Sequence, residues 1–311
     1  MKKLLVLVAL LWAVTASAAF PDKPIKIITN MPVGSGPDNV QRKMAEKLSE
    51  KWGVPVIVEN KPGGSGAVAF SAYDLAPADG YHILVSDPGQ MISYPTLYNK
   101  PEVLTNLEPS AGVFFTPFVI ISAPSVKDFA ELKVIFKNKP MFSTMAIGTG
   151  MHLEGMDLSS YWNIDSTHVA YPNLSLSYVD VSNGLVPLTI STIASSRQLE
   201  AGGKIKYIAY GGDRRHPDYP NVPTLRELTG NSTTNYHSWN MAYIKKAVPA
   251  DIKAKIAKDI SDVMKTPEMK SHLKTVGYDP LPGTPADLEK FVDSETINFK
   301  KAINKYKINV Q

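Results

Sequence analysis

Short apolar runs and helical periodicities alternate along the first hundred residues. The runs at 25–29, 55–59 and 81–86 have the length and composition of short buried β-strands. In the segment 39–51 an apolar residue recurs at every fourth position, which is typical of a helix that buries one face. An alanine-rich helix that ends near residue 76 follows the second strand. Strands and helices that alternate with short connections predict a parallel sheet covered by helices on both faces.

The same alternation continues, and the last third of the chain is helical. Apolar residues one helical turn apart begin at Ile252 and recur in the last helix. The runs near residues 120 and 242 would be natural crossovers between two lobes. Further strands are predicted at 118–122, 141–145, 168–171, 187–191, 206–210 and 239–244, and further helices at 124–137 and 151–162.

The first eighteen residues have the order of charged, apolar and small residues of a secretory signal peptide. Two lysines precede an apolar run at 4–14, and an Ala-Ser-Ala sequence ends at Ala18. The apolar run is too short to span a bilayer comfortably. We therefore expect a signal peptide at residues 1–18, with cleavage after Ala18 or Ala19, and an exported, soluble mature chain.

Composition excludes several classes of function. Removing the two lysines of the leader from the 33 basic residues leaves 31 against 29 acids, a net charge of +2. This balance is not that of a nucleic-acid-binding protein, which usually has a strong basic patch. The chain has no cysteine, so it uses neither disulfides nor thiol chemistry. Its six histidines lack the spacing of metal ligands, so we expect no metal site.

The loop 32–38, between the first strand and the first helix, has the composition of an anion-binding loop. Its Gly-Ser-Gly sequence supplies two glycines of a dinucleotide-binding motif, and Glu59 stands where such folds place an acid that binds the ribose. However, Asn39 occupies the position of the third glycine, and nicotinamide cofactors are not expected outside the cytoplasm. We expect several free backbone N–H groups in this loop, where the helix dipole favours an anion. Asp38 is interpreted as an acid that stabilises its own helix.

A second glycine-rich loop, at 148–153, also lies between a strand and a helix. Two such loops, one in each lobe, could bind the two ends of a small anion. Alternatively, glycine and serine are simply common in loops of this type. The segment 63–66 resembles a nucleophile elbow, but Ala67 replaces its last glycine, so we interpret it as a turn.

Motifs of one family occur in order along essentially the whole mature chain. They are found at 20–28, 32–38, 58–66, 77–81, 148–152, 164–171, 220–224, 238–239 and 276–280. Together they resemble the Bug family, the TctC-like periplasmic solute-binding proteins of tripartite tricarboxylate transporters. Each motif is weak by itself, but the ordered set is specific.

The resemblance implies an α/β, two-lobed fold of the periplasmic binding protein type (type II, Venus flytrap) with two crossover strands. Lobe 1 would comprise residues 19–121 and 243–311, and lobe 2 residues 122–242. The lobes would close on a small carboxylate, often a di- or tricarboxylate or an acidic amino acid. A monomer would deliver it to the membrane permease of the transporter, without a cofactor and without catalysis.

In this family, backbone amides of the first loop and a Gly/Ser/Thr loop of the second lobe bind the carboxylates of the ligand. The ligand-binding residues that the resemblance implies here are Pro32, Val33, Gly34, Ser35, Gly36, Asp38, Ser86, Asp87, Gly148, Thr149, Gly150, His152, Tyr171, Ser191 and Thr192.

The chain departs from the family pattern in the second lobe. The segment 172–174 replaces a usual Lys-Gly-Ser, and 183–187 replaces a usual Gly-Gly-Gln-Val-Asp. Ala146 replaces a frequent glycine and Ser191 a common aspartate. Without an acid at Ser191, selection for a ligand amine would be weaker, so we expect a carboxylate without an amino group.

Two other functions stay open at this point. A sensory protein would bind the same kind of ligand and pass it to a membrane receptor instead of a permease. An exported hydrolase would need an activated pair of serine and histidine side chains.

Overall fold

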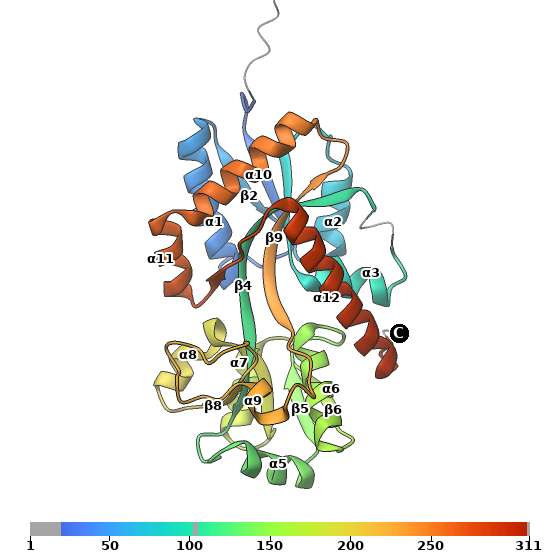
Figure 1. Ribbon diagram of the computed structural model, residues 1–311, viewed down its shortest axis with the longest axis vertical. Coiled ribbons are helices and arrows are strands. Elements are labelled where there is room, and N and C mark those ends of the chain that lie inside the picture. Colours follow the sequence, from blue (N-terminus) through green and yellow to red (C-terminus); the bar gives the residue numbers. More distant parts are fainter. Residues whose placement is uncertain (1–19, 102–104, 310–311) are drawn as a thin grey trace, which may run out of the picture.

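In the computed structural model, which describes residues 20–101 and 105–309, two lobes are joined by two long strands (Figure 1). The two strands are β4 (Leu107–Ser122) and β9 (His237–Lys245), and they pair with each other in antiparallel orientation. The predicted signal peptide lies outside the described residues. The predicted lobe boundaries at 121/122 and 242/243 stay a prediction.

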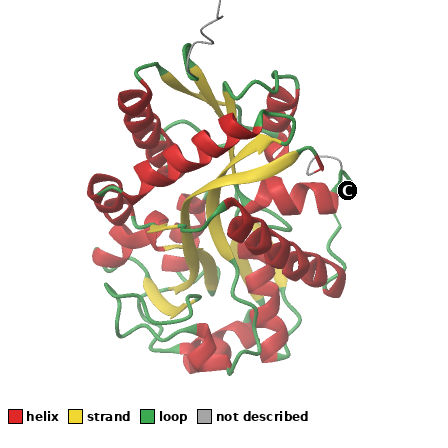
Figure 2. Cartoon of the chain, turned by 45° about the horizontal axis from the view of Figure 1, so that its top comes forward, coloured by secondary structure: helices red, strands yellow, loops and turns green. Residues whose placement is uncertain are grey.

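Each lobe contributes parallel strands to one continuous, curled sheet with helices on its outside (Figure 2). The path of the sheet is β2-β1-β3-β9-β4-β7-β5-β6. In the first lobe β1 pairs in parallel with β2 and β3, and in the second β5 pairs in parallel with β6 and β7. The bounds of these strands are Ile25–Thr29 for β1, Val56–Asn60 for β2, His82–Ser86 for β3, Met141–Thr144 for β5, Thr167–Ala170 for β6 and Leu188–Thr192 for β7.

The parallel sheet predicted for the first three strands is confirmed, and the centre of the molecule adds antiparallel pairs to it. β3 and β9 are antiparallel, and β4 is antiparallel to β7, β8 (Lys206–Tyr210) and β10 (Asp279–Pro280). β4 leads from the first lobe into the second, and β9 leads back. Each of them is therefore antiparallel to its neighbour in the lobe that it enters, β7 for β4 and β3 for β9. The mixed sheet is thus a consequence of the two crossovers.

The helices cover the sheet much as the periodicity predicts. In α1 the three residues at four-residue spacing, Val40, Met44 and Leu48, are fully buried. The helix expected at 124–137 begins only at Phe129, because the Asp128 side chain accepts a hydrogen bond from Glu131 N and caps it there. The helices of the first lobe are α1 (Gly36–Trp52), η1 (Gly64–Gly66), α2 (Ala67–Asp74), η2 (Gly89–Ser93), α3 (Tyr94–Leu97), α10 (Ala250–Lys265) and α11 (Pro267–Val276).

The sequence does not give the bounds of several short helices and of one long helix. In the second lobe these are α7 (Leu174–Ser182), α8 (Ile193–Ala201) and α9 (Leu225–Thr229), beside the expected α5 (Phe129–Asn138) and α6 (Gly150–Trp162). The last helix, α12 (Pro285–Lys305), packs on β4 and also contacts η2 and α6 (Figure 1). At its end Lys305 forms an ion pair with Asp157 of α6. No described helix is long and apolar enough to cross a membrane.

Candidate ligand-binding cavity

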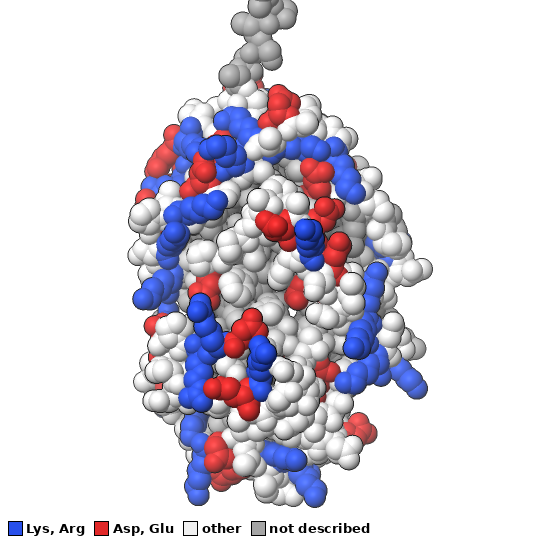
Figure 3. All heavy atoms as spheres, viewed as in Figure 1, with Lys and Arg blue, Asp and Glu red and all other residues white. Residues whose placement is uncertain are grey.

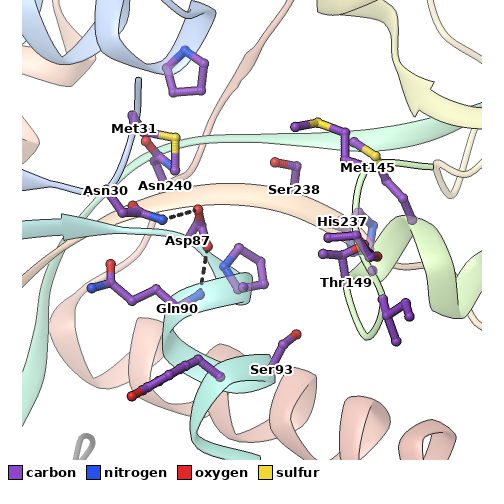
Figure 4. A pocket seen from close by; sticks show the side chains of 18 of the residues that line it. Asn30, Met31, Asp87, Gln90, Ser93, Met145, Thr149, His237, Ser238 and Asn240 are labelled. Atoms are coloured by element: carbon purple, nitrogen blue, oxygen red, sulfur yellow. Dashed lines mark hydrogen bonds between the residues drawn. The ribbon is translucent and has the colours of Figure 1, made fainter. Parts of the chain in front are cut away.

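A cavity of about 400 Å³ lies between the two lobes, beside the crossover strands (Figure 4). The first lobe contributes residues of the loop after β1 and of the segment from β3 to α3 to its wall. The second lobe contributes the loop 145–149 and the first residues of α6, and the crossover strands contribute Phe118 of β4 and the first residues of β9. Its volume lies at the lower end of the range of about 300–1,000 Å³ that is typical of small-molecule sites.

Most of the wall is apolar. Met31, Phe118, Met145 and Ile147 line the cavity together with prolines and tyrosines. Met145 and Ile147 are each 46% exposed, although large apolar side chains of this kind are usually buried. A wall of this composition fits the apolar part of a small molecule, with a few polar groups to orient it.

The main polar feature of the wall is the pair Asn30 and Asp87, which directly follow the neighbouring strands β1 and β3. Asn30 Nδ2 donates to Asp87 Oδ2 at 3.0 Å, and Gln90 N donates to Asp87 Oδ1 at 2.9 Å (Figure 4). Burial raises the pKa of Asp87, and the hydrogen bonds from Asn30 and the backbone N–H groups of Gln90 and Gly89 oppose this effect. The other titratable side chain in the wall whose pKa is shifted, His237, has its pKa lowered by burial, which favours the neutral imidazole.

The other polar end of the cavity is the start of α6. Thr149 caps the helix, since its hydroxyl accepts from His152 N at 3.4 Å and donates to Ala146 O at 2.9 Å. Gly150 and Met151 line the cavity in the first turn, where backbone N–H groups have no partner within the helix. The positive end of the helix dipole therefore points at this part of the wall.

The loop after β1 does not have the free donors that the sequence predicts. Gly34 N donates to Asp38 Oδ2 at 2.8 Å, Ser35 N donates to Pro32 O at 3.2 Å, and Asp38 N donates to Ser35 Oγ at 3.3 Å. The expectation of free N–H groups is wrong for these three residues, because a carboxylate, a backbone carbonyl and a hydroxyl of the loop itself accept their hydrogen bonds. Burial alone would raise the pKa of Asp38, but hydrogen bonds from Arg42, Asn60 and Gly34 N outweigh it and the pKa is lowered.

Of the fifteen residues proposed from the sequence, four line the cavity: Pro32, Asp87, Thr149 and Gly150. Val33 is 73% exposed and Gly34, Ser35 and Asp38 form the closed loop described above. Gly36 instead lines a second hollow, on the side of the molecule where α7, α8 and α11 meet. The structure therefore brings together residues of both predicted loops, but only in part.

The remaining predicted residues are engaged inside the protein. Ser86 Oγ donates to Gln90 Oε1, and Gly148 N donates to His152 Nδ1, whose pKa burial lowers to about 3. In the second lobe Tyr171 is hydrogen-bonded to Asp180, and Ser191 is hydrogen-bonded to Tyr178. Thr192 caps α8 and is hydrogen-bonded to Ser195.

Sequence reasoning missed part of the wall. Asn30, Ser93, His237 and Asn240 line the cavity. Asn30 directly follows β1, whereas the other three come from η2 and β9, two elements that were not associated with the ligand. One signal was available: Asn240 is a polar residue inside the apolar run of a crossover strand, and it is only 1% exposed. Ser93 and His237 could be found only once η2 and β9 were placed beside the first loop.

The part of the chain that the structure describes shows no metal-binding cluster and no patch of like charge on the face that Figure 3 presents. That part holds no group of three or more His, Cys, Asp or Glu side chains suited to a metal ion. On the face shown in Figure 3, basic and acidic side chains are interspersed over both lobes. The pair Thr144 Oγ1 and His168 Nε2, 2.7 Å apart, is part of the packed interior of the second lobe and does not line the cavity.

Comparison with known proteins agrees with this architecture. The family model described as "Tripartite tricarboxylate transporter family receptor" matches residues 40–308. A UPF0065 protein from the tcbD–tcbE intergenic region of Pseudomonas sp. (strain P51) is 27% identical over 94% of this chain and 88% of its own length. The structure of the periplasmic binding protein BugD superposes with a TM-score of 0.79 at 24% identity, covering 94% of this chain and 100% of that one. R. palustris Rpa4515 with adipate gives a TM-score of 0.83 at 23% identity, covering 93% and 99%. These similarities confirm the predicted two-lobed binding-protein fold.

Proposed function

Because the chain belongs to the tripartite tricarboxylate transporter receptor family, we propose that it is a periplasmic solute-binding protein for a small organic carboxylate. It captures the ligand between its lobes and delivers it to the membrane permease of such a transporter, without catalysing a reaction. The observation that carries this proposal is the cavity of about 400 Å³ whose wall comes from both lobes. A ligand that contacts both lobes at once favours their closed arrangement, which is the signal that a receptor of this kind transmits.

The start of α6 is the part of the wall suited to a carboxylate. The first-turn N–H groups of Gly150 and Met151 and the helix dipole together form an anion site of a common kind. This is the second of the two loops that the sequence singled out. The similarity to a protein crystallised with adipate supports a carboxylate ligand.

The cavity also limits the size and polarity of the ligand. Its volume suits a molecule of metabolite size, and the side chains of Phe118, Met145 and Ile147 would cover an apolar segment between polar ends. We assign the ligand to Pro32, Asp87, Thr149 and Gly150, which were foreseen, and to Asn30, Ser93 and Asn240, which were not. Gly34, Ser35 and Asp38 would then support the loop from behind.

Calorimetric titration with mono-, di- and tricarboxylates tests the proposal, with a sugar and a nucleotide as reference compounds. Saturable one-to-one binding of at least one carboxylate is expected, and the reference compounds should not bind. Tight binding of the sugar or the nucleotide, with no carboxylate bound, would overturn the proposal. Hydrolysis of ester or amide substrates at enzymatic rates would show instead that the protein is a hydrolase.

Delivery to a permease is tested separately. Membrane vesicles that contain the permease should take up the identified carboxylate only when the purified protein is present. Uptake that does not depend on the protein would reject its role in transport and favour a sensory role.

A further inference from the structure

The end of the cavity formed by Asn30 and Asp87 presents hydrogen-bond acceptors to a ligand. Asp87 can only accept when it is ionised, and this fixes the orientation of the Asn30 amide, whose Nδ2 donates to Asp87 Oδ2. Asn30 Oδ1 is buried and finds no hydrogen-bond partner among the described residues. A carboxylate has about four acceptor positions, of which the described donors occupy only part.

The hydroxyl donor of Ser93 and one N–H of each neighbouring side-chain amide are already used by the protein. Ser93 Oγ donates to Gly148 O at 2.8 Å, and Asn240 Nδ2 donates to Trp239 O at 3.0 Å. Gln90 Nε2 donates to Gly66 O at 2.7 Å. Each amide nitrogen keeps a second N–H. The open capacity for a ligand that donates therefore comes from the carboxylate of Asp87 and from Asn30 Oδ1, which has no partner among the described residues.

The charge of the wall points the same way. Among the described residues that line the cavity there is no lysine and no arginine, so no cation of the wall balances Asp87. When Asp87 is ionised, a ligand carboxylate placed beside it would meet a like charge in a partly desolvated site, which is unfavourable. A cationic nitrogen at the same position would meet an opposite charge and a free acceptor.

The two ends of the cavity are separated. Figure 4 shows Asn30 and Asp87 on one side and Thr149 on the other, with Ser238 between them. One end thus suits a positive donor and the other, at the start of α6, suits a carboxylate.

Resting on the proposed function, we infer that the ligand is a small zwitterion: a carboxylate with an apolar body and a cationic amine that donates to Asp87. This reverses the expectation drawn from Ser191. That expectation rested on the missing acid at Ser191, whereas Asp87, another of the predicted site residues, comes from the other lobe and lies in the wall.

Matched ligands test the inference in the intact protein by calorimetric titration. The probes are 6-aminohexanoate against hexanoate and adipate, and leucine against 4-methylpentanoate, so that amines at either end of the carbon chain are covered. The variants are Asp87→Asn, which keeps the shape of the side chain and removes its charge, and Glu289→Gln as control. Glu289 is exposed on α12 and lies outside the cavity wall, so its substitution changes the net charge equally.

In the unsubstituted protein, the preferred amino compound should bind about thirtyfold or more tightly than its partner without the amine. In Asp87→Asn the two should bind within about threefold of each other, while Glu289→Gln keeps the preference. The comparison in the unsubstituted protein is informative even if Asp87→Asn fails to fold.

Two results would overturn the inference and leave the proposed function intact. One is tighter binding of adipate, hexanoate or 4-methylpentanoate than of the amino compounds by the unsubstituted protein. The other is an unchanged preference for the amine in correctly folded Asp87→Asn. Failure of every carboxylate, amino or not, to bind in the wider panel would instead reject the proposed function itself.

Discussion

Asp38 Oδ2 accepts a hydrogen bond from Gly34 N at 2.8 Å, so the first glycine-rich loop encloses a carboxylate of the chain itself. The same oxygen also accepts from Arg42 Nε, while Asp38 Oδ1 accepts from Asn60 Nδ2. Asp38 is 1% exposed, so these bonds are made in the interior. The loop has the backbone of an anion site, but an internal anion occupies it, and its role is to fix the start of α1.

Replacing this internal anion should destabilise the fold. Asp38→Asn is expected to lower the free energy of unfolding by about 1–3 kcal/mol at pH 7, because a buried, charge-assisted network loses its acceptor. Urea denaturation measures the loss, with Glu289→Gln on the exposed face of α12 as a control expected to stay within about 0.5 kcal/mol. Equal stability of the two variants would contradict the role given to Asp38.

The pH dependence of this effect has a definite sign. The pKa of Asp38 is lowered in the folded state, so its contribution is present above the ordinary value of 3.8 and is lost as the pH falls through the folded pKa. The difference in stability between the unsubstituted protein and Asp38→Asn should therefore shrink as the pH falls below about 4. A difference that is constant from pH 7 to pH 3 would show that the charge of Asp38 is not involved.

The sequence predicts local structure well where burial follows a regular period. Val40, Met44 and Leu48 are fully buried as expected, and the strands β1 and β8 have the predicted bounds. Strand direction was not predictable in the centre, because the pairing of β4 with β9 depends on where the chain returns from the second lobe.

The site was predictable only in part, for a related reason. Composition located both glycine-rich loops, but it could not show that Asp38 would accept from Gly34 N in the first. The contact between Asn30 and Asp87 joins residues 57 positions apart, and the wall contributed by Asn240 depends on the path of a crossover strand. Relations of this kind appear only when the sheet is assembled.

The start of α1 is also closely packed against Tyr278. A Cβ atom on Gly36 would lie 2.5 Å from Tyr278 Oη, and the ring of Tyr278 stacks on Phe114 at 4.1 Å between centroids. Gly36→Ala should therefore cost about 1–3 kcal/mol of stability. In a Tyr278→Phe background, which removes the hydroxyl, the same substitution should cost clearly less. A double-mutant cycle from urea denaturation measures the coupling, and additive effects would contradict the contact.

Glu154 of α6 should make stability depend on pH in the neutral range. Burial raises its pKa to about 8, and within the described residues its Oε1 has no hydrogen-bond partner. Between the ordinary pKa of 4.5 and about 8 the folded state holds a proton that the unfolded state has released, so this group lowers stability as the pH rises.

The variant Glu154→Gln lacks this proton equilibrium. Its stability relative to the unsubstituted protein should rise by about 2–4 kcal/mol between pH 5 and pH 8. Urea denaturation at several pH values gives this difference directly. Parallel stability curves for the two proteins would show that Glu154 is ionised in the folded state at neutral pH.

The cap of α6 should matter for both stability and binding. Thr149→Val removes the hydroxyl that accepts from His152 N and donates to Ala146 O, and should cost about 1 kcal/mol of stability. It should also weaken binding of the tightest carboxylate found by calorimetry, because the first turn of α6 loses its position. Thr149→Ser keeps the hydroxyl and should restore both properties. Binding that is unchanged in Thr149→Val would separate the start of α6 from the ligand.

The most direct test of the account is a crystal structure of the protein with the tightest-binding carboxylate. We predict that the ligand occupies the cavity between the lobes, with its carboxylate within hydrogen-bonding distance of the backbone N–H groups of Gly150 and Met151. A ligand found instead in the second hollow, beside Arg197 and Lys204, with the cavity between the lobes left without it, would contradict the account.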